Sequence, residues 1–254
     1  MRIKYSIPSS YLEYGWFPLN YDPLKGLPFS SQYTYFSLWA FWNELQAEIL
    51  KAIRHRVKDV SRKRKSNKTQ REVFLDVLGQ ILGRKEVEAT LINGKRITTR
   101  IYISPRTFEI IPKAFTNENP YFFPIKDDDF CSLYCVSRRS LTGSNGSREL
   151  LKEKNLIDYR VRWEGKKILE YKLLDPLKDV IELGRNEIHD IFYNHDYSYS
   201  SKVIFFWFEK YCRERKIIQN EDNIINLRDF KDFCGFDIKT IKKSFDEIEN
   251  LFPL

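Results

Sequence analysis

Hydrophobic residues at helical spacing form the first pattern along the chain. Between residues 31 and 60, apolar side chains recur at steps of three and four: Leu38, Phe41, Trp42, Leu45, Ile49 and Ile53. This period predicts an amphipathic helix, and a similar run predicts a second helix over residues 71–82. Residues 1–30 lack the period and are rich in proline, glycine and aromatic side chains. We expect them to form an aromatic N-terminal arm that packs on the body or on a partner.

Two further segments alternate between apolar and polar residues, with the period of two that β-strands show. In residues 86–103, the pair Asn93-Gly94 separates two β-prone runs, which predicts a hairpin. Residues 158–174 alternate on both sides of a turn at residues 164–167, which predicts a second hairpin. Between the hairpins, the proline-rich residues 104–124 predict a loop with one short helix.

The residues before the second hairpin predict two short helices. The first starts at three consecutive aspartates, residues 127–129, whose charges favour the positive end of a helix dipole. Ser137 is a good N-cap for the second helix, which opens with two arginines. The sequence from Gly143 to Gly146 opposes this helix, because an interior glycine costs about 1 kcal/mol relative to alanine. The second helix therefore either breaks at the glycines or starts later, near Ser147.

After Asp175-Pro176, which breaks the last strand, the helical period returns. It predicts four helices, at residues 177–192, 201–215, 227–233 and 238–251. Gly235 follows the third of these helices and Asp237 caps the fourth. A long helix, a short helix, a glycine turn and another helix follow the order of a helix-turn-helix unit.

Basic residues exceed acidic ones, which gives a net charge of +8 and an isoelectric point of about 9.1. This excess favours a polyanionic partner, and a basic surface kept for solubility is the alternative. Residues 51–72 hold ten Lys or Arg against two acids, and residues 61–69 contain no apolar side chain. A solvated linker would explain an average run of charge, but for an excess this large we expect contact with a phosphate backbone.

Two short helices followed by a basic-tipped hairpin, as in residues 125–174, resemble the winged-helix superfamily of DNA-binding proteins. The resemblance covers about 50 residues and rests on the order of the elements. With the C-terminal helices, it implies an α+β, mostly helical fold of tandem winged-helix-like units with an aromatic N-terminal arm. The resemblance implies three parts. Residues 1–30 are the arm, and residues 31–196 hold helices, a hairpin and a first winged-helix domain. Residues 197–254 are a second unit, incomplete or wingless.

The resemblance also implies which side chains contact DNA. In this fold, first-turn residues of the recognition helix reach the bases and the hairpin contacts the backbone. The candidate DNA-binding residues are Arg62, Lys63, Arg64, Lys65 and Lys68 in the basic run, Ser137, Arg138, Arg139, Ser140 and Arg148 in the central helices, Lys166 and Lys167 at the hairpin tip, and Lys239, Lys242 and Lys243 on the last helix.

Side chains suited to catalysis or metal binding are few. Asp158 and the triplet Glu170-Tyr171-Lys172 match the spacing of the restriction-type nuclease site, where two carboxylates hold Mg²⁺. In a two-stranded wing these side chains would point to solvent, so the nuclease is an alternative and not the main prediction. The four cysteines include no Cys-x-x-Cys pair, and no histidine is close to them in the sequence. We expect reduced core thiols, and no catalytic residue, metal or cofactor.

These observations predict a non-enzymatic, sequence-specific protein that binds double-stranded DNA. Tandem winged helices with basic faces resemble plasmid-type replication initiators, which implies binding to origin repeats and, as further partners, a second copy of the chain or host replication or transcription proteins. The alternatives are a winged-helix transcriptional regulator, a Mg-dependent restriction-type nuclease, and a basic subunit docked on RNA or a protein complex. No apolar run reaches 18 residues, so we expect no membrane partner and a cytoplasmic, nucleoid-associated protein.

Overall fold

The computed structural model describes residues 13–63, 87–90, 96–99, 123–163, 167–174, 179–217 and 225–248. In these residues the fold is α+β and mostly helical, as the sequence predicts. The helix predicted over residues 71–82 and most of the loop predicted over residues 104–124 lie outside them. Among the described helices, none combines the length and the apolar character needed to cross a membrane.

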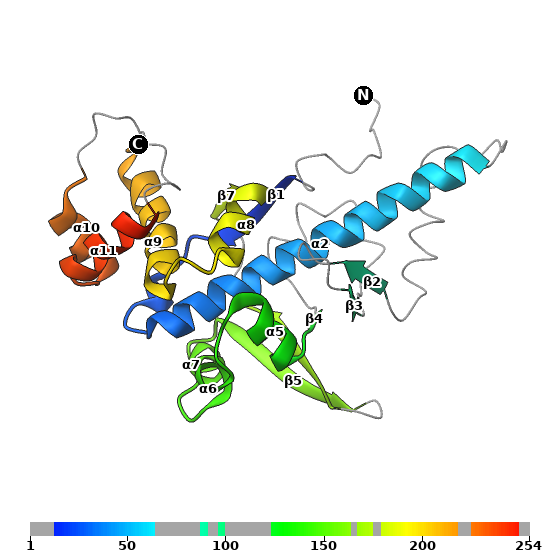
Figure 1. Cartoon of the computed structure of the whole chain (residues 1–254), viewed down its shortest axis with the longest axis horizontal. Coiled ribbons are helices and arrows are strands. Elements are labelled where there is room, and N and C mark those ends of the chain that lie inside the picture. Colours follow the sequence, from blue (N-terminus) through cyan, green and yellow to red (C-terminus); the bar gives the residue numbers. More distant parts are fainter. Residues whose placement is uncertain are drawn as a thin grey trace.

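One long helix, α2 (Phe29–Lys63), runs through the molecule, and several of the other elements pack along it (Figure 1). It confirms the helix predicted from the apolar period. Every residue from Ser31 to Leu45 is buried, so this half of α2 is surrounded by protein on all sides. The buried polar side chains of α2 therefore need partners. The side chain of Gln32, for example, accepts a hydrogen bond from Trp207 Nε1 at 2.9 Å.

The described part of the predicted N-terminal arm packs into the body. Strand β1 (Tyr14–Pro18) pairs antiparallel with β7 (Val180–Gly184). A short 3₁₀ helix, η1 (Asp22–Leu24), then leads toward α2. Phe17 and Tyr21 are fully buried, so the aromatic residues of this segment contribute to the core of the protein.

The segment predicted as one helix over residues 177–192 is instead a strand followed by a helix, β7 and α8 (Arg185–Tyr193). Ile181 and Leu183 alternate into the core, and β1 supplies the strand edge with which β7 pairs. The prediction was wrong because this pairing with a distant strand outweighs local helix propensity. At the junction, the carboxylate of Glu187 accepts a hydrogen bond from the Gly184 backbone N–H and caps α8.

Asn43 fastens β1 to α2. Its side chain accepts a hydrogen bond from Trp16 N at 3.1 Å and donates one to Trp16 O at 2.8 Å, as the backbone of a neighbouring strand would. Gly15 favours this close approach, because a Cβ at that position would lie 3.3 Å from Asn43 Cβ. It would also lie 2.6 Å from Ile188 Cδ1, the end of a flexible side chain on α8 that would have to shift.

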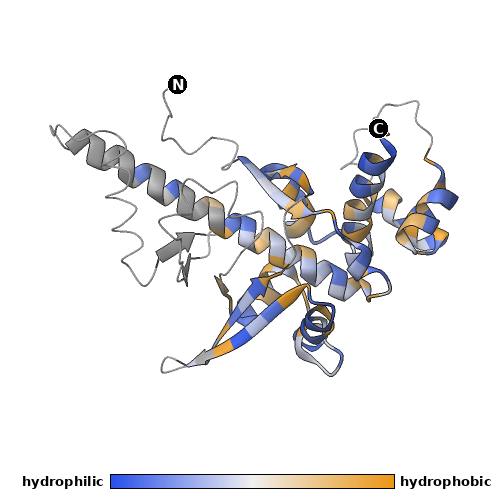
Figure 2. Cartoon of the chain, turned by 180° about the vertical axis from the view of Figure 1, so that it is seen from behind, coloured by the Kyte–Doolittle hydropathy of each residue, from blue (hydrophilic) through white to orange (hydrophobic). Residues whose placement is uncertain are grey.

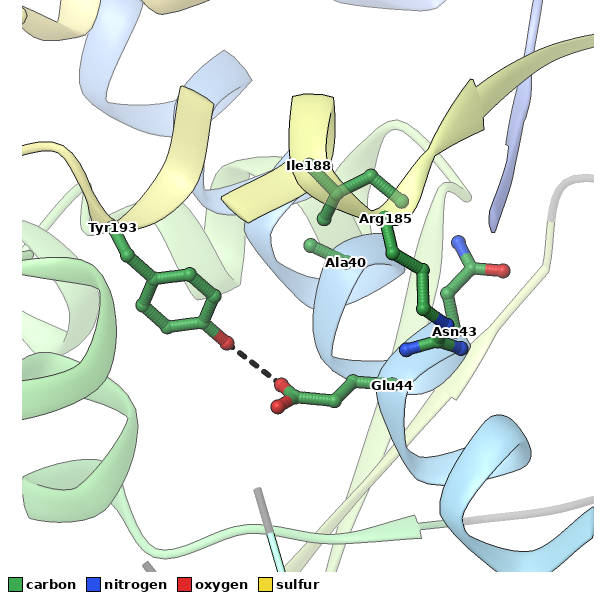
Figure 3. A pocket seen from close by; sticks show the side chains of 6 residues that line it. All are labelled: Ala40, Asn43, Glu44, Arg185, Ile188 and Tyr193. Carbon is green, nitrogen blue, oxygen red and sulfur yellow. Dashed lines mark hydrogen bonds between the residues drawn. The ribbon is translucent and has the colours of Figure 1, made fainter. Parts of the chain in front are cut away.

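A small pocket separates α2 from α8 beside this clamp (Figure 3). It is lined by Ala40, Asn43, Glu44, Arg185, Ile188 and Tyr193. The Tyr193 hydroxyl donates a hydrogen bond to Glu44 Oε2 at 2.7 Å across it, and burial, together with the nearby Glu44 charge, raises the pKa of Tyr193. Because Tyr193 and Glu44 bind each other and the Asn43 amide binds backbone groups, we interpret the pocket as a contact that joins α8 to α2.

The central residues form three short helices and an antiparallel sheet. Their bounds are α5 (Asp127–Tyr134), α6 (Arg138–Thr142), α7 (Ser147–Glu153), β4 (Phe123–Pro124), β5 (Ile157–Trp163) and β6 (Lys167–Leu173). The second predicted helix is thus two helices, divided at the glycine-rich sequence. The strand order is β4-β6-β5, and the β5–β6 hairpin that the alternation predicts projects away from α2 (Figure 1).

The hairpin predicted around Asn93-Gly94 is also present as β2 (Val87–Thr90) and β3 (Arg96–Thr99), which pair antiparallel. The turn between them lies outside the described residues. Thr90 pairs with Arg96, so the two strands flank the Asn93-Gly94 pair in the sequence.

The C-terminal helices are α9 (Tyr199–Arg215), α10 (Leu227–Cys234) and α11 (Ile238–Ile248), close to their predicted bounds. Gly235 ends α10 in a left-handed conformation, with φ of +79°. The Asp237 carboxylate caps α11 by accepting a hydrogen bond from Thr240 N at 2.9 Å. Nearly all buried apolar residues of the described chain form one cluster that extends from β1 to α11.

Candidate nucleic-acid interface

Helix α11 presents a basic face to solvent. Lys239, Lys242 and Lys243 are exposed, and their spacing places them on one side of the helix. Apolar residues on the other side of α11 pack against α9 and α10. Figure 2 shows hydrophilic and hydrophobic residues together on these helices. Lys243 Nζ lies 3.7 Å from Glu247 Oε1, and this lysine side chain is 76% exposed. Such an exposed ion pair is weak, so the positive charge of Lys243 remains available to a ligand.

The N-terminus of α11 is capped by an acid and does not add to this positive face. Hydrogen bonds from the Thr240 side chain and backbone hold the pKa of the Asp237 carboxyl below its usual value, which keeps this cap ionised. Its negative charge offsets the positive end of the helix dipole. The three exposed lysines, and not the helix end, are therefore what suits α11 to a polyanion.

The predicted N-terminus of α6 is confirmed, and its basic residues are exposed. Ser137 caps the helix by accepting a hydrogen bond from Ser140 N at 3.0 Å. Arg138 Nη1 lies 2.9 Å from Asp128 Oδ1, with the two side chains 67% and 76% exposed. Arg139 is exposed as well. This turn can therefore contact a ligand, although the helix it opens has only five residues.

The start of the central α7 helix, which includes the predicted DNA-binding residue Arg148, contacts the protein instead. Ser147, the first residue of α7, is fully buried, and its hydroxyl is hydrogen-bonded to that of Ser31. Arg148 Nε donates to the Tyr171 hydroxyl at 2.8 Å, and its guanidinium also pairs with Asp127. Arg148 thus joins α7 to α5 and β6, and its guanidinium is engaged inside the protein.

The other predicted positions are described only in part. Arg62 and Lys63 end α2 and Lys167 begins β6, and of these residues the structure describes only the backbone. The remaining candidates lie outside the described residues: Arg64, Lys65, Lys68 and Lys166. Their contact with DNA stays a prediction from sequence.

The residues of the suggested nuclease site are engaged separately. Asp158 Oδ1 lies 3.0 Å from Lys152 Nζ, and the Lys152 hydrogen bond lowers the pKa of this carboxyl. Glu170 is buried and accepts a hydrogen bond from Arg160 Nε at 2.7 Å. Asp158 pairs with Lys172 across the strands. Within the described ranges, no three His, Cys, Asp or Glu side chains are grouped so that they could hold a metal.

The structure brings together one pair of reactive side chains that the sequence did not reveal. Cys135 Sγ, at the end of α5, lies 3.0 Å from His195 Nδ1 in the loop before α9. The Tyr199 hydroxyl donates a hydrogen bond to the Cys135 carbonyl in the same place. Nearby, burial lowers the pKa of Lys202 to about 8. Because 60 residues separate the cysteine from the histidine, no short motif indicates this contact.

Comparison of the chain with protein-family models, with curated proteins and with solved structures gives no match.

Proposed function

We propose that the protein binds double-stranded DNA in a sequence-specific manner and that the basic face of α11 is its principal contact surface. The observation that carries the proposal is the exposed set Lys239, Lys242 and Lys243 on the helix that follows α10 and the Gly235 turn. In a helix-turn-helix unit, this last helix is the one that approaches the groove. Lysines there would neutralise phosphates and release counterions, which favours binding.

The order of the central elements supports a second contact. Strand β4, helices α5 to α7 and then the β5–β6 hairpin, which pairs with β4 in one sheet, follow an order of elements like that of a winged helix. In such a unit, the exposed Arg138 and Arg139 would lie near DNA, and the hairpin tip would contact the backbone. Arg148 would then hold α7 in position without contacting DNA.

Two such units in one chain fit a replication initiator of the plasmid type, which binds repeated sites at an origin. The basic run over residues 51–72 would add further phosphate contacts. This finer role rests on the order of the elements and on the charge of the chain.

The salt dependence of duplex binding tests the proposal. Affinity of the full chain for a duplex of about 30 base pairs, long enough for two units, is measured by fluorescence anisotropy at several salt concentrations. The triple variant Lys239→Ala/Lys242→Ala/Lys243→Ala should lower the slope of log affinity against log salt by about 2.7, or about 0.9 for each phosphate that the variant no longer neutralises. The triple Lys→Arg variant keeps the charge and should retain the wild-type slope.

Two results would contradict the proposal. If wild-type affinity does not change with salt, or if duplex DNA does not bind at low salt, the protein is not a DNA-binding protein of this kind. If the alanine and arginine variants have the same slope, α11 is not the contact surface. Specificity is tested separately by selecting bound duplexes from a random library, in which a recurring site should be enriched.

A further inference from the structure

Cys135 differs from the other cysteines of the chain in its surroundings. The sequence predicts reduced thiols in the core, and Cys212 and Cys234 are buried as expected. Cys135 is instead exposed, at the end of α5, where its backbone is left-handed with φ of +54°. Its Sγ lies 3.0 Å from His195 Nδ1. Cys135 is therefore a thiol that solvent reaches and that has an imidazole base within hydrogen-bonding reach.

The fold holds the segment that carries His195 against the end of α5. Just after His195, the Tyr199 hydroxyl donates a hydrogen bond to the backbone carbonyl of Cys135. The Tyr199 ring is itself fixed, because it stacks on the buried ring of Tyr33 with the two centroids 4.8 Å apart. The thiol and the imidazole are thus brought together by two segments that are 60 residues apart in the chain.

A buried cation lies close to this pair. Lys202, in the first turn of α9, is 3% exposed, and its ammonium donates to two neutral groups, the Tyr33 hydroxyl at 3.4 Å and the Phe192 carbonyl at 3.5 Å. Burial lowers the pKa of Lys202 to about 8, whereas a negative charge on Cys135 acts to raise it. The attraction is mutual, so the ammonium stabilises a thiolate at Cys135 relative to the thiol.

Cys131, one turn earlier on the same helix, has the opposite surroundings. It is partly buried, and burial together with the nearby charges of Asp127 and Asp128 raises the pKa of its thiol. The two cysteines of α5 therefore differ in their neighbours, which are acids beside Cys131 and a base and a cation beside Cys135. The thiolate is the nucleophilic form of cysteine, so Cys135 should react faster than Cys131.

We propose that Cys135 is a modification site that undergoes thiol–disulfide exchange with small-molecule disulfides, with His195 as its acid–base partner. The thiol proton passes to His195 Nδ1, and the Cys135 sulfur attacks one sulfur of the disulfide. A bond forms between these two sulfurs as the S–S bond of the small molecule breaks, and the leaving thiolate takes the proton from His195. One disulfide replaces another, so the small disulfide is the sole oxidant. The site does not depend on the proposed DNA contacts.

The test follows the reaction of the full chain with oxidised glutathione at pH 7, and peptide mass mapping locates the modified cysteine. Cys135 should be modified about tenfold faster than Cys131. An ordinary thiol is only a few per cent thiolate at pH 7, and a stabilised thiolate loses part of its nucleophilicity, which together give a factor of this size. Cys212 and Cys234 are buried and should stay unmodified as long as the chain is folded.

Substitutions then separate the role of His195 from that of its surroundings. His195→Ala should slow the reaction at Cys135 about tenfold, and added imidazole should restore part of the rate, because this position is exposed. His189→Ala removes another exposed histidine, on α8, and should leave the rate unchanged. Cys131→Ser should also leave the rate unchanged, and it prevents Cys131 from displacing the adduct.

Three results would overturn the proposal. Equal rates at Cys135 and Cys131 would show that the surroundings of Cys135 do not activate its thiol. A His195→Ala variant that reacts as fast as wild type would exclude His195 as the acid–base partner. A slow His195→Ala variant that imidazole does not restore, while the buried cysteines stay unmodified, would show that His195 only positions the segment. Duplex binding is a separate measurement, so the proposed function can fail or stand without changing these outcomes.

Discussion

Helices α7 and α11 occupy similar places in two similar orders of elements, yet their basic residues are used differently. Each follows a short helix and a turn that contains glycine. In α7 the first-turn Arg148 binds Asp127 and Tyr171 inside the protein. In α11 the three lysines face solvent.

The place of a charged residue in a helix-turn-helix order therefore does not determine whether it can contact DNA. What matters is which partners the neighbouring elements supply. Beside α7, α5 supplies a carboxylate and β6 supplies a buried phenol, and both can accept a hydrogen bond from Arg148. Helix α11 packs through its apolar side, so its lysine side remains in water.

The largest effect on stability should follow the loss of Arg148. Arg148→Ala should lower the free energy of unfolding by about 2–4 kcal/mol, because it leaves Asp127 without its cation and Tyr171 without its hydrogen-bond donor. Urea denaturation of the full chain measures this change. Lys242→Ala, on α11, should change stability by less than about 0.5 kcal/mol, since it is an exposed lysine. Equal effects of the two substitutions would contradict the comparison.

A smaller effect on stability should appear at low pH, and it involves a contact of α11. Although burial acts to raise it, hydrogen bonds from Ser201 and Ser198 lower the pKa of Glu247 below its usual value. The pKa of Glu247 is thus lower in the folded protein than in the unfolded chain. The ionised Glu247 therefore stabilises the fold above the unfolded pKa, and this stabilisation is lost as pH falls through the folded pKa. Glu247→Gln should flatten the fall of melting temperature below about pH 4.3.

Glu153→Gln is the matched control for this prediction, because Glu153 is an exposed glutamate at the end of α7. It should leave the acid dependence of the melting temperature unchanged. If both substitutions flatten the curve equally, the contact between Glu247 and the start of α9 does not hold α11 in place.

The smallest effect should come from the exposed arginine pair on α6. Arg138 and Asp128 form the same kind of ion pair as Arg148 and Asp127, but they stand in solvent. A double-mutant cycle on Arg138→Ala and Asp128→Ala should give a coupling energy of about 0.5 kcal/mol or less, which salt reduces further. A coupling as large as that between Arg148 and Asp127 would show that burial is not the cause of the difference.

Local signals in the sequence predicted local structure well. The Ser137 and Asp237 caps and the Gly235 helix end are where the sequence places them, because each depends on neighbours within a few residues. The alternation in residues 158–174 likewise predicted the β5–β6 hairpin. The alignment of the lysines on one face of α11 also follows directly from helical spacing.

Contacts between distant residues account for what the sequence did not predict. Strand β7 was predicted as helix because its partner, β1, lies near the other end of the chain. Arg148 was predicted to face DNA because neither Asp127 nor Tyr171 is adjacent to it in the sequence. The exposure of Trp163 depends on where α7 stops covering the hairpin, which spacing along one strand does not indicate.

The burial of α2 has a consequence for how the chain acquires its fold. Gln32 on this helix meets Trp207, which is 175 residues later in the chain. At a synthesis rate of about 5–20 residues per second, α2 leaves the ribosome on the order of 10–35 seconds before α9 can cover it. Until then its aromatic residues are exposed, and the contacts that will bury them have a high sequence separation, which slows folding. We therefore expect the aromatic residues of the newly made helix to be prone to aggregation until α9 is made.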